Sequence, residues 1–257
     1  MFAICNLTLV PVRKESSDRS EMVSQLLFGD IIEILDKHKS WYKVKMLADD
    51  YIGWIDQKQV ALITDEEKAN YDAQSSFISN DILQIAILNN SEMSTIVMGS
   101  TLPFYSNKKL SFGGNNYSFE GNTVMVTSKR PDNITLQAQL YLNSPYLWGG
   151  RSPFGIDCSG LTQIVYKICG YKLPRDAIQQ AEQGETISFL EETIPGDLAF
   201  FDNEEGKIIH VGIITHGSNI IHASGKVRMD KLDHQGIFNA ETKKYSHKLR
   251  LIKRHIS

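Results

Sequence analysis

One cysteine at the start of a predicted helix is well placed for covalent chemistry. Cys158 follows a loop rich in glycine and proline and precedes an apolar segment, residues 161–168, that we expect to be helical. The positive end of a helix dipole favours the thiolate over the thiol, and the thiolate is the form that attacks a carbonyl carbon. A cysteine taken alone is more often a small buried apolar residue. The interpretation therefore depends on the residues that accompany it.

Two histidines lie in β-branched stretches further along the chain. His210 stands within residues 207–215 and His222 within residues 219–225, and the glycine and serine between the stretches predict a turn. Because side chains alternate across a strand, an antiparallel hairpin can bring both imidazoles to one face. A lone strand histidine is more often a packed core residue, but two of them after a helix-start cysteine favour catalysis. One imidazole would take the thiol proton, and a second polar group would hold that imidazole.

The elements that position these residues predict an α+β domain over residues 129–257. A helix is expected within 131–143 and another after Cys158. The later patterns predict strands at 198–202, 207–215, 219–225, 227–232 and 248–252. Helices followed by an antiparallel sheet would pack the cysteine helix against the histidine strands.

The first half of the chain predicts β-structure instead. Residues 1–63 contain short strands separated by turn signals, which indicate a small β-barrel. Residues 64–73 form an acidic connector, helical or looped, and residues up to 128 repeat the strand and turn pattern more weakly. We expect a second, divergent barrel over 64–128. The alternative is an irregular β-extension that props the flanking domains.

Composition narrows the function classes. The chain has 257 residues, a formal net charge of −3 and a hydrophobic fraction of 42%, so nothing indicates a nucleic-acid partner. Cys5, Cys158 and Cys169 form neither a disulfide framework nor a metal-binding spacing, and no cofactor or metal is expected. We expect no membrane span and no signal peptide, which favours the cytoplasm. A leader removed before position 1 would leave the same sequence.

Five short motifs resemble the NlpC family of papain-like cysteine peptidases, which cut peptidoglycan stem peptides. They occur in the family's order, with its short gap between the histidines: Tyr146-x-Trp-Gly-Gly, Asp157-Cys158-Ser159-Gly160, Pro195-Gly196-Asp197-Leu198, His210-Val-Gly-Ile and His222-Ala-Ser. The resemblance implies cleavage after γ-D-glutamate, before meso-diaminopimelate or lysine. It also implies Cys158 as nucleophile, His210 as general base and acid, His222 as its orienting group, and Tyr146 near the oxyanion.

The N-terminal region resembles the bacterial SH3-like domain, through its Trp-Tyr-Lys-Val and Gly-Trp-Ile strands. Barrels of this kind ahead of the catalytic domain are similar to the YkfC-type dipeptidyl peptidases, which act on free murein peptides that begin with L-Ala. The resemblance implies a clamp for the substrate ammonium group and contacts beside the nucleophile, with these candidates: Glu21, Tyr51, Asp157, Ser159 and Asp176. A buried ammonium needs opposite charge and acceptors around it. Ala177 stands where that subgroup often has serine.

Other interpretations of these candidates stay open. Glu21 can be a solvated loop carboxylate, and Tyr51 can be an aromatic residue that packs the barrel. The whole chain can be an amidase or acyltransferase on another γ-glutamyl substrate, a wall-binding module, or a secreted wall hydrolase. The sequence does not determine the third residue of the substrate or the oligomeric state.

Overall fold

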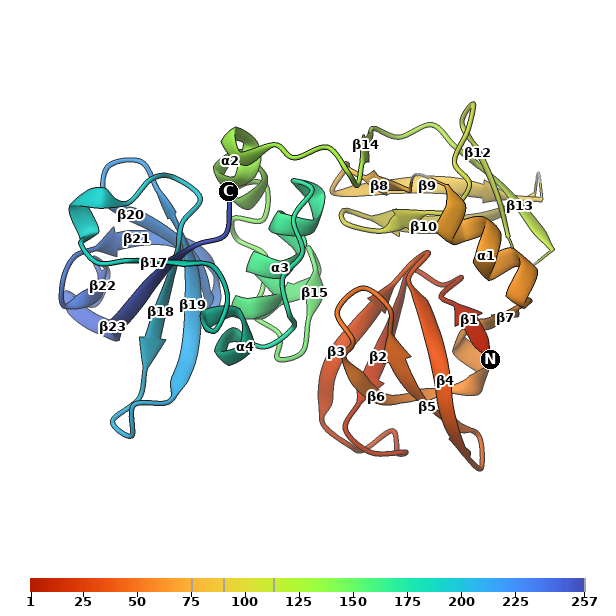
Figure 1. Ribbon diagram of the computed structural model, residues 1–257, viewed down its shortest axis with the longest axis horizontal. Helices are drawn as coiled ribbons and strands as arrows, with labels where there is room; N and C mark the ends of the chain where they lie inside the picture. The colour runs from red at the N-terminus through yellow and green to blue at the C-terminus, as the bar shows by residue number, and fades with distance from the viewer. Residues whose placement is uncertain (75, 90, 113, 257) are drawn as a thin grey trace. The chain divides into compact units, whose positions relative to one another are not determined.

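The computed structural model describes residues 1–74, 76–89, 91–112 and 114–256 and divides into two compact units (Figure 1). The first unit contains residues 1–128 together with a short later segment, Trp148–Pro153. The second unit contains Lys129–Leu147 and the chain from Phe154 to the C-terminus. The loop of the Tyr146-x-Trp-Gly-Gly motif thus belongs in part to the N-terminal unit.

The N-terminal unit begins with an antiparallel sheet of seven short strands in the order β3-β2-β6-β5-β4-β1-β7. Alternation along these strands buries one face, with Val10, Val12, Val44 and Ile55 fully inside. The strands are β1 (Phe2–Ile4), β2 (Leu9–Arg13), β3 (Met22–Leu27), β4 (Ile31–His38), β5 (Trp41–Met46), β6 (Ile52–Asp56) and β7 (Ala61–Ile63), with a 3-10 turn at Gln57–Gln59.

The acidic connector is the helix α1 (Asp65–Ala73). Thr64 and Glu67 form a capping box, and acidic residues fill the first turn, where the helix dipole favours negative charge. Two small antiparallel sheets follow, β10-β9-β13-β12 and β11-β8-β14. Their strands are β8 (Phe77–Ser79), β9 (Leu83–Leu88), β10 (Glu92–Val97), β11 (Thr101–Leu102), β12 (Lys109–Phe112), β13 (Asn115–Phe119) and β14 (Thr123–Met125).

The two β-regions of this unit share a core. Phe28 of the first region meets the rings of Phe112 and Tyr117 of the second, with centroids 5.4 and 5.3 Å away. A buried polar contact, from the Thr101 hydroxyl to the Asp30 carboxylate at 3.4 Å, joins the same regions. The middle region is therefore packed as part of the N-terminal unit, since its aromatic residues share a buried cluster with Phe28 of the first region.

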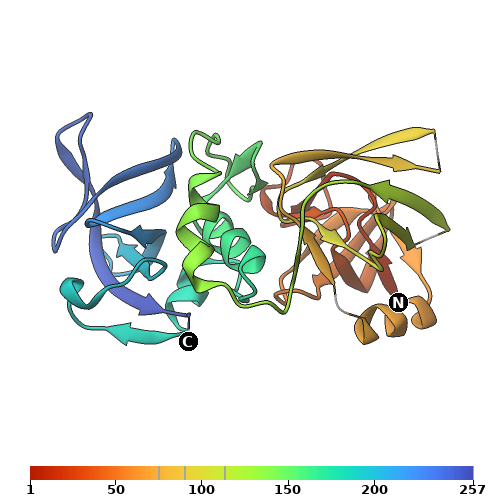
Figure 2. The same ribbon diagram turned by 90° about the horizontal axis from the view of Figure 1, so that it is seen from above.

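The C-terminal unit packs helices against one side of an antiparallel sheet, which both views show (Figures 1 and 2). The helices are α2 (Ile134–Gln139), α3 (Cys158–Ile168) and α4 (Ala177–Ala181), with 3-10 turns at Pro131–Asn133 and Leu190–Glu192. The strands are β17 (Glu185–Ile187), β18 (Leu198–Asp202), β19 (Ile208–Thr215), β20 (Asn219–Ser224), β21 (Lys226–Leu232), β22 (Gly236–Asn239) and β23 (Lys244–Arg254). Short strands β15 (Arg151–Ser152) and β16 (Gly155–Ile156) flank the boundary at Pro153.

The strand order of this sheet is β17-β23-β18-β19-β20-β21-β22, and β22 also pairs with β23. This last pairing closes six strands into a ring. Strand β23 also pairs with β18, which pairs with β19, so only one strand separates β23 from the strand of His210.

Two details qualify the predicted helices. The helix expected within 131–143 is shorter, because a 3-10 turn occupies Pro131–Asn133 and Asn143 adopts a left-handed conformation, φ +69°. The helix after the loop begins at Cys158 itself. Among the described residues, no helix combines the length and apolar character that crossing a membrane requires.

Candidate active site

Cys158 is the first residue of α3, and polar groups around the helix start fix its position. The Asp157 carboxylate caps the helix by accepting a hydrogen bond from the Gly160 backbone N–H at 2.7 Å. Helix α3 packs against β19, and the thiol forms a hydrogen bond with the backbone of Val211. Because Val211 follows His210, the thiol lies beside the strand that carries the first histidine.

The resting thiol is protonated, which corrects the expectation from the helix dipole. Burial, followed by the Asp157 carboxylate, raises the pKa of the Cys158 thiol to about 12. The Val211 hydrogen bond and the Arg175 charge act in the opposite direction but do not prevail. Only 7% of Cys158 is exposed, and the loss of hydration outweighs the dipole. A base must therefore remove the proton during attack.

The two histidines meet on one face of the predicted hairpin. Strands β19 and β20 are antiparallel, with Gly212 opposite His222, so His210 and His222 are diagonal neighbours. His210 Nε2 lies 2.9 Å from His222 Nδ1, and both rings are buried. A Cβ on Gly212 would lie 2.9 Å from the Cβ of His222 and closer still to Ile220. The glycine in His210-Val-Gly therefore makes room for the second imidazole.

A carboxylate and an arginine continue this chain. His222 Nε2 lies 3.0 Å from Asp230 Oδ2, and Arg228 donates to both oxygens of Asp230, at 2.6 and 3.1 Å. Burial tends to raise the pKa of Asp230, but hydrogen bonds from His222 and Arg228 hold it below its ordinary value. The ionised carboxylate then accepts from His222 Nε2–H, which leaves His222 Nδ1 as the acceptor for His210 Nε2–H.

This proton arrangement identifies the basic atom. His210 uses Nε2 as a donor, so its Nδ1 carries the free lone pair and is the nitrogen left for the thiol. Burial, followed by the neighbouring His247 and His222, holds the pKa of His210 well below its ordinary value. The imidazole is neutral at pH 7 and can accept a proton.

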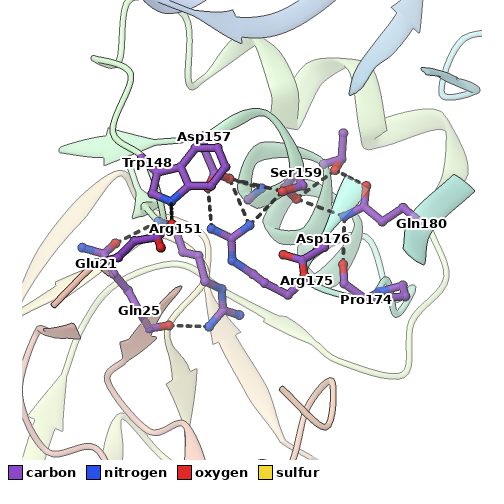
Figure 3. Close-up of polar contacts among 12 residues, drawn as sticks. Glu21, Gln25, Trp148, Arg151, Asp157, Ser159, Pro174, Arg175, Asp176 and Gln180 are labelled. Carbon is purple, nitrogen blue, oxygen red and sulfur yellow. Dashed lines mark hydrogen bonds and ion pairs between the residues drawn. The ribbon is translucent and has the colours of Figure 1, made fainter. Parts of the chain in front are cut away.

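Arg175 is bound to the two residues that flank Cys158 in the chain. Its guanidinium is 1% exposed and makes two bonds to Asp157, at 3.0 and 2.5 Å, and one to the Ser159 hydroxyl at 2.8 Å (Figure 3). Gln180 adds a bond from its amide to the Ser159 carbonyl oxygen at 3.1 Å. Asp157 and Ser159, expected to contact substrate, are thus bound by this arginine inside the protein.

Tyr146 and Asp176 lie at the edges of this cluster. Tyr146 is half-buried, its backbone bridges to Ile156, and burial followed by the charges of Cys158 and Asp157 raises its pKa to about 12. The phenol is therefore protonated and able to donate a hydrogen bond. Asp176 is half-buried at the start of α4, directly after Arg175.

The candidates of the N-terminal unit have partners of their own. The Glu21 carboxylate accepts a hydrogen bond from Trp148 Nε1 at 2.8 Å and lies 3.6 Å from Lys14 Nζ (Figure 3). Tyr51 packs against the core of the first β-region, which is the packing alternative considered for it. Their roles in substrate binding stay predictions.

The segment 148–153 is fastened within the same unit by a buried arginine. Arg151 donates to the carbonyl oxygen of Gln25 at 2.6 Å and pairs with Asp30 at 3.3 Å, and its backbone N–H donates to the Gln25 side chain. Gly149 has φ +77°, and a Cβ there would lie 2.5 Å from the Met22 carbonyl oxygen. The first glycine of the Tyr146-x-Trp-Gly-Gly motif is thus required by a close backbone approach.

Sequence reasoning missed Arg175, Arg228 and Asp230. The hairpin register supplies a signal for the latter two, because a tight turn at Gly225 places Arg228 opposite His222 and puts Asp230 two residues further on. Arg175 stood beside the candidate Asp176 in a loop, and its burial was not visible from that position.

Comparison with known proteins matches both halves of the chain. Residues 143–246 match the NlpC/P60 family, and residues 12–60 match the bacterial dipeptidyl-peptidase SH3 domain. A γ-D-glutamyl-L-lysine dipeptidyl-peptidase of Bacillus subtilis is 28% identical, over 78% of this chain and 71% of its own length. Dipeptidyl-peptidase 6 of Lysinibacillus sphaericus is 26% identical, over 91% and 93%.

Solved structures share the fold. The crystal structure of an NlpC/P60 family protein from Bacillus cereus superposes with a TM-score of 0.84 over the whole of both chains, at 19% identity. The predicted fold class, a papain-like α+β domain after an SH3-like β-region, is confirmed. The resemblance drawn from the short motifs is confirmed as well.

Proposed function

We propose that this cysteine peptidase, which carries an NlpC/P60 domain and an SH3-like domain, hydrolyses the bond between γ-D-glutamate and the L-diamino acid of peptidoglycan stem peptides. The substrate has a free N-terminal L-Ala, and the diamino acid is lysine or meso-diaminopimelate. We place the reaction in cell-wall peptide recycling, where such free peptides arise.

The order of domains supports this substrate class. The Lysinibacillus relative named dipeptidyl-peptidase 6 aligns with 91% of this chain, and the Bacillus subtilis γ-D-glutamyl-L-lysine dipeptidyl-peptidase aligns with 78% of it. A protein named probable endopeptidase p60, from Listeria monocytogenes, aligns with only 40% of this chain, at 38% identity. The N-terminal unit is therefore the feature that favours a dipeptidyl-peptidase over a wall endopeptidase.

The observation that carries the chemistry is the Arg228–Asp230–His222–His210 chain beside Cys158. His210 Nδ1 takes the thiol proton as Sγ attacks the γ-glutamyl carbonyl carbon. The developing oxyanion is met by the Cys158 backbone N–H at the helix start and by the protonated Tyr146 hydroxyl.

The tetrahedral intermediate then collapses. Its C–N bond breaks, and His210 passes the proton to the leaving amine of the diamino acid, which leaves an acyl-thioester on Cys158. Water attacks the thioester while His210 accepts one of its protons, and the C–S bond breaks to release the dipeptide. The proton returns to the Cys158 sulfur, so no external acid or base is consumed.

The Asp176 carboxylate is the proposed partner of the substrate ammonium group in the C-terminal unit. It is half-buried, and an ammonium group removed from water requires an anionic acceptor. Arg175 next to it donates hydrogen bonds to Asp157 and Ser159.

Mass spectrometry of the purified protein with L-Ala-γ-D-Glu-diaminopimelate, its lysine counterpart and their N-acetylated forms tests the proposal. We expect release of L-Ala-D-Glu from the free peptides and little from the acetylated ones. Cys158→Ser should release nothing while keeping the circular dichroism of the wild type.

Other outcomes redirect the assignment. Equal cleavage of acetylated and free peptides would contradict the ammonium requirement and favour a wall endopeptidase. Cleavage of neither, with transfer of the acyl group to an added amine from another γ-glutamyl donor, would favour an acyltransferase.

A further inference from the structure

A third histidine lies against the catalytic imidazole. His247 of β23 stacks on His210 with ring centroids 4.0 Å apart and planes 19° from parallel. It lies 25 residues after His222 and 37 residues after His210 in the chain, and strand β18, which pairs with both β19 and β23, brings β23 near them. Neither the sequence motifs nor the proposed proton transfers assign it a role.

The stack is fixed from several sides. Phe201 of β18 meets His247 at 5.9 Å and His210 at 5.8 Å, and His222 meets His247 nearly perpendicularly at 5.7 Å. His247 Nδ1 lies 2.9 Å from the Ser246 hydroxyl, which restrains its own ring. Rotation of the His210 ring out of its plane would therefore meet an imidazole on one face and a phenyl ring beside it.

The arrangement is not that of a metal centre. Ligand atoms of the three histidines lie within 4.8 Å of one another, but a shared ion requires lone pairs that converge at about 2.1 Å. The nearly parallel rings of His210 and His247 direct their lone pairs side by side. His210 and His222 already share a hydrogen bond. Stacking, not chelation, is the interaction that this geometry provides.

We propose that His247 is a positioning residue that stacks on His210 and keeps its imidazole in the plane in which Nδ1 is directed to the Cys158 thiol. The His222 hydrogen bond fixes one atom of the ring, Nε2, and leaves rotation about that contact. A flat ring at 4.0 Å removes this freedom. The inference rests on the proposed Cys158–His210 site and not on the identity of the peptide.

The charge state of the cluster agrees with this role. The titratable groups around the stack are His222, Asp230 with its partner Arg228, and Cys158. Burial, followed by His222, lowers the pKa of His247 to about 4, so the stacked ring is neutral at pH 7. Two neutral rings stack without charge repulsion. Burial next to a second imidazole also disfavours the protonated form of His210.

Variants at position 247 separate stacking from charge. His247→Ala removes the ring, and a misplaced base should lower kcat by about tenfold to a hundredfold with little change in KM. His247→Phe keeps a flat ring and should recover most of kcat. Opening the site to water in the alanine variant should also move the acid limb of the pH–kcat profile to higher pH, and the phenylalanine variant should move it less. His234→Ala, an exposed histidine of the same unit, is the matched control.

Alkylation of Cys158 by iodoacetamide, followed by peptide mass mapping across pH, reports the thiol–imidazole pair without any substrate. We expect the rate to fall in His247→Ala and to recover in His247→Phe. If His247→Ala kept the wild-type rates and pH profile, the positioning role of His247 would be overturned, but the proposed Cys158–His210 site would not. A wild-type protein whose activity survives Cys158 alkylation would overturn the proposed site, and the inference with it. Stoichiometric zinc binding that His247→Ala abolishes would assign the cluster to a metal and overturn the stacking role.

Discussion

Two arginine–aspartate pairs lie near Cys158, the proposed nucleophile, and their carboxylates bind different groups. On the helix side Arg175 is bound to Asp157, whose remaining capacity caps α3. On the sheet side Arg228 is bound to Asp230, which instead holds the titratable ring of His222. The Asp157 carboxylate thus accepts from a backbone N–H, whereas the Asp230 carboxylate accepts from an imidazole N–H. The first ion pair therefore fixes the start of the helix that carries Cys158. The second ion pair determines which nitrogen of His222 carries the proton.

This difference predicts that substitutions on the helix side lower the stability, whereas substitutions on the sheet side lower the catalytic rate. Loss of a group on the helix side leaves a buried charge without its counter-ion and should lower stability. Loss of a group on the sheet side leaves the fold in place but removes or misdirects the base.

Removing the base itself should have the largest effect. His210→Gln keeps a buried polar side chain but cannot take the thiol proton, and kcat should fall by about 10³- to 10⁴-fold. The free energy of unfolding should change little, because no permanent charge is left unpaired. Peptide-release kinetics and urea unfolding of the same preparations measure both quantities. Loss of structure in this variant would mean that the sheet side, too, stabilises the fold.

Removing the helix-side arginine should act on stability instead. Arg175→Gln leaves Asp157 buried without its counter-ion, and the C-terminal unit should lose about 3–5 kcal/mol. Hydrogen exchange of the α3 amides measures the loss. Tryptophan fluorescence is an internal control, because all three tryptophans, Trp41, Trp54 and Trp148, belong to the N-terminal unit.

A double variant checks the cause. Arg175→Gln with Asp157→Asn removes both charges, so it should be more stable than Arg175→Gln alone. Glu191→Gln, which removes one partner of an exposed pair with His234, should leave stability unchanged. A double variant as unstable as the single one would show that lost packing, not the unpaired charge, causes the effect.

The tautomer assignment predicts an intermediate effect. Asp230→Asn can turn its amide N–H toward His222 Nε2, which would make Nδ1 the protonated nitrogen and set two N–H groups against each other at His210. The kcat should fall by about a hundredfold, with the fold retained. Arg228→Gln, which leaves the carboxylate in place, should lower kcat much less. Equal losses in both variants would contradict the tautomer role.

Local patterns predicted much of the fold. The strand Leu198–Asp202 has the bounds expected from sequence, because a short apolar and aromatic run after a turn signal leaves little ambiguity. The hairpin that joins His210 to His222 was predictable for the same reason. His210 and His222 are twelve residues apart with one turn between them, and the antiparallel register of the hairpin places both on one face of the sheet.

What sequence did not predict depends on longer closures or on burial. Arg175 reaches Asp157 across a loop whose path no periodicity encodes, and His247 reaches His210 because β18 pairs with both β19 and β23. Burial also reversed the expected charge state of Cys158, since a helix dipole is a smaller effect than complete desolvation. The candidate catalytic residues could be proposed from the sequence, whereas the groups that surround them depend on tertiary packing.

The smallest predicted effect is the loss of stability at low pH, which should begin in the strands that carry the histidines. Burial holds the pKa of His210 well below its ordinary value and that of His247 at about 4. Unfolding raises both pKa values toward about 6.5, so the unfolded chain binds more protons between these limits. Their contribution to stability is complete above pH 6.5 and is lost as the pH falls toward 4. Hydrogen exchange should therefore show β19 and β20 losing protection before α3, and His247→Phe should reduce the loss. Simultaneous loss in α3 would mean that the two sides do not open independently.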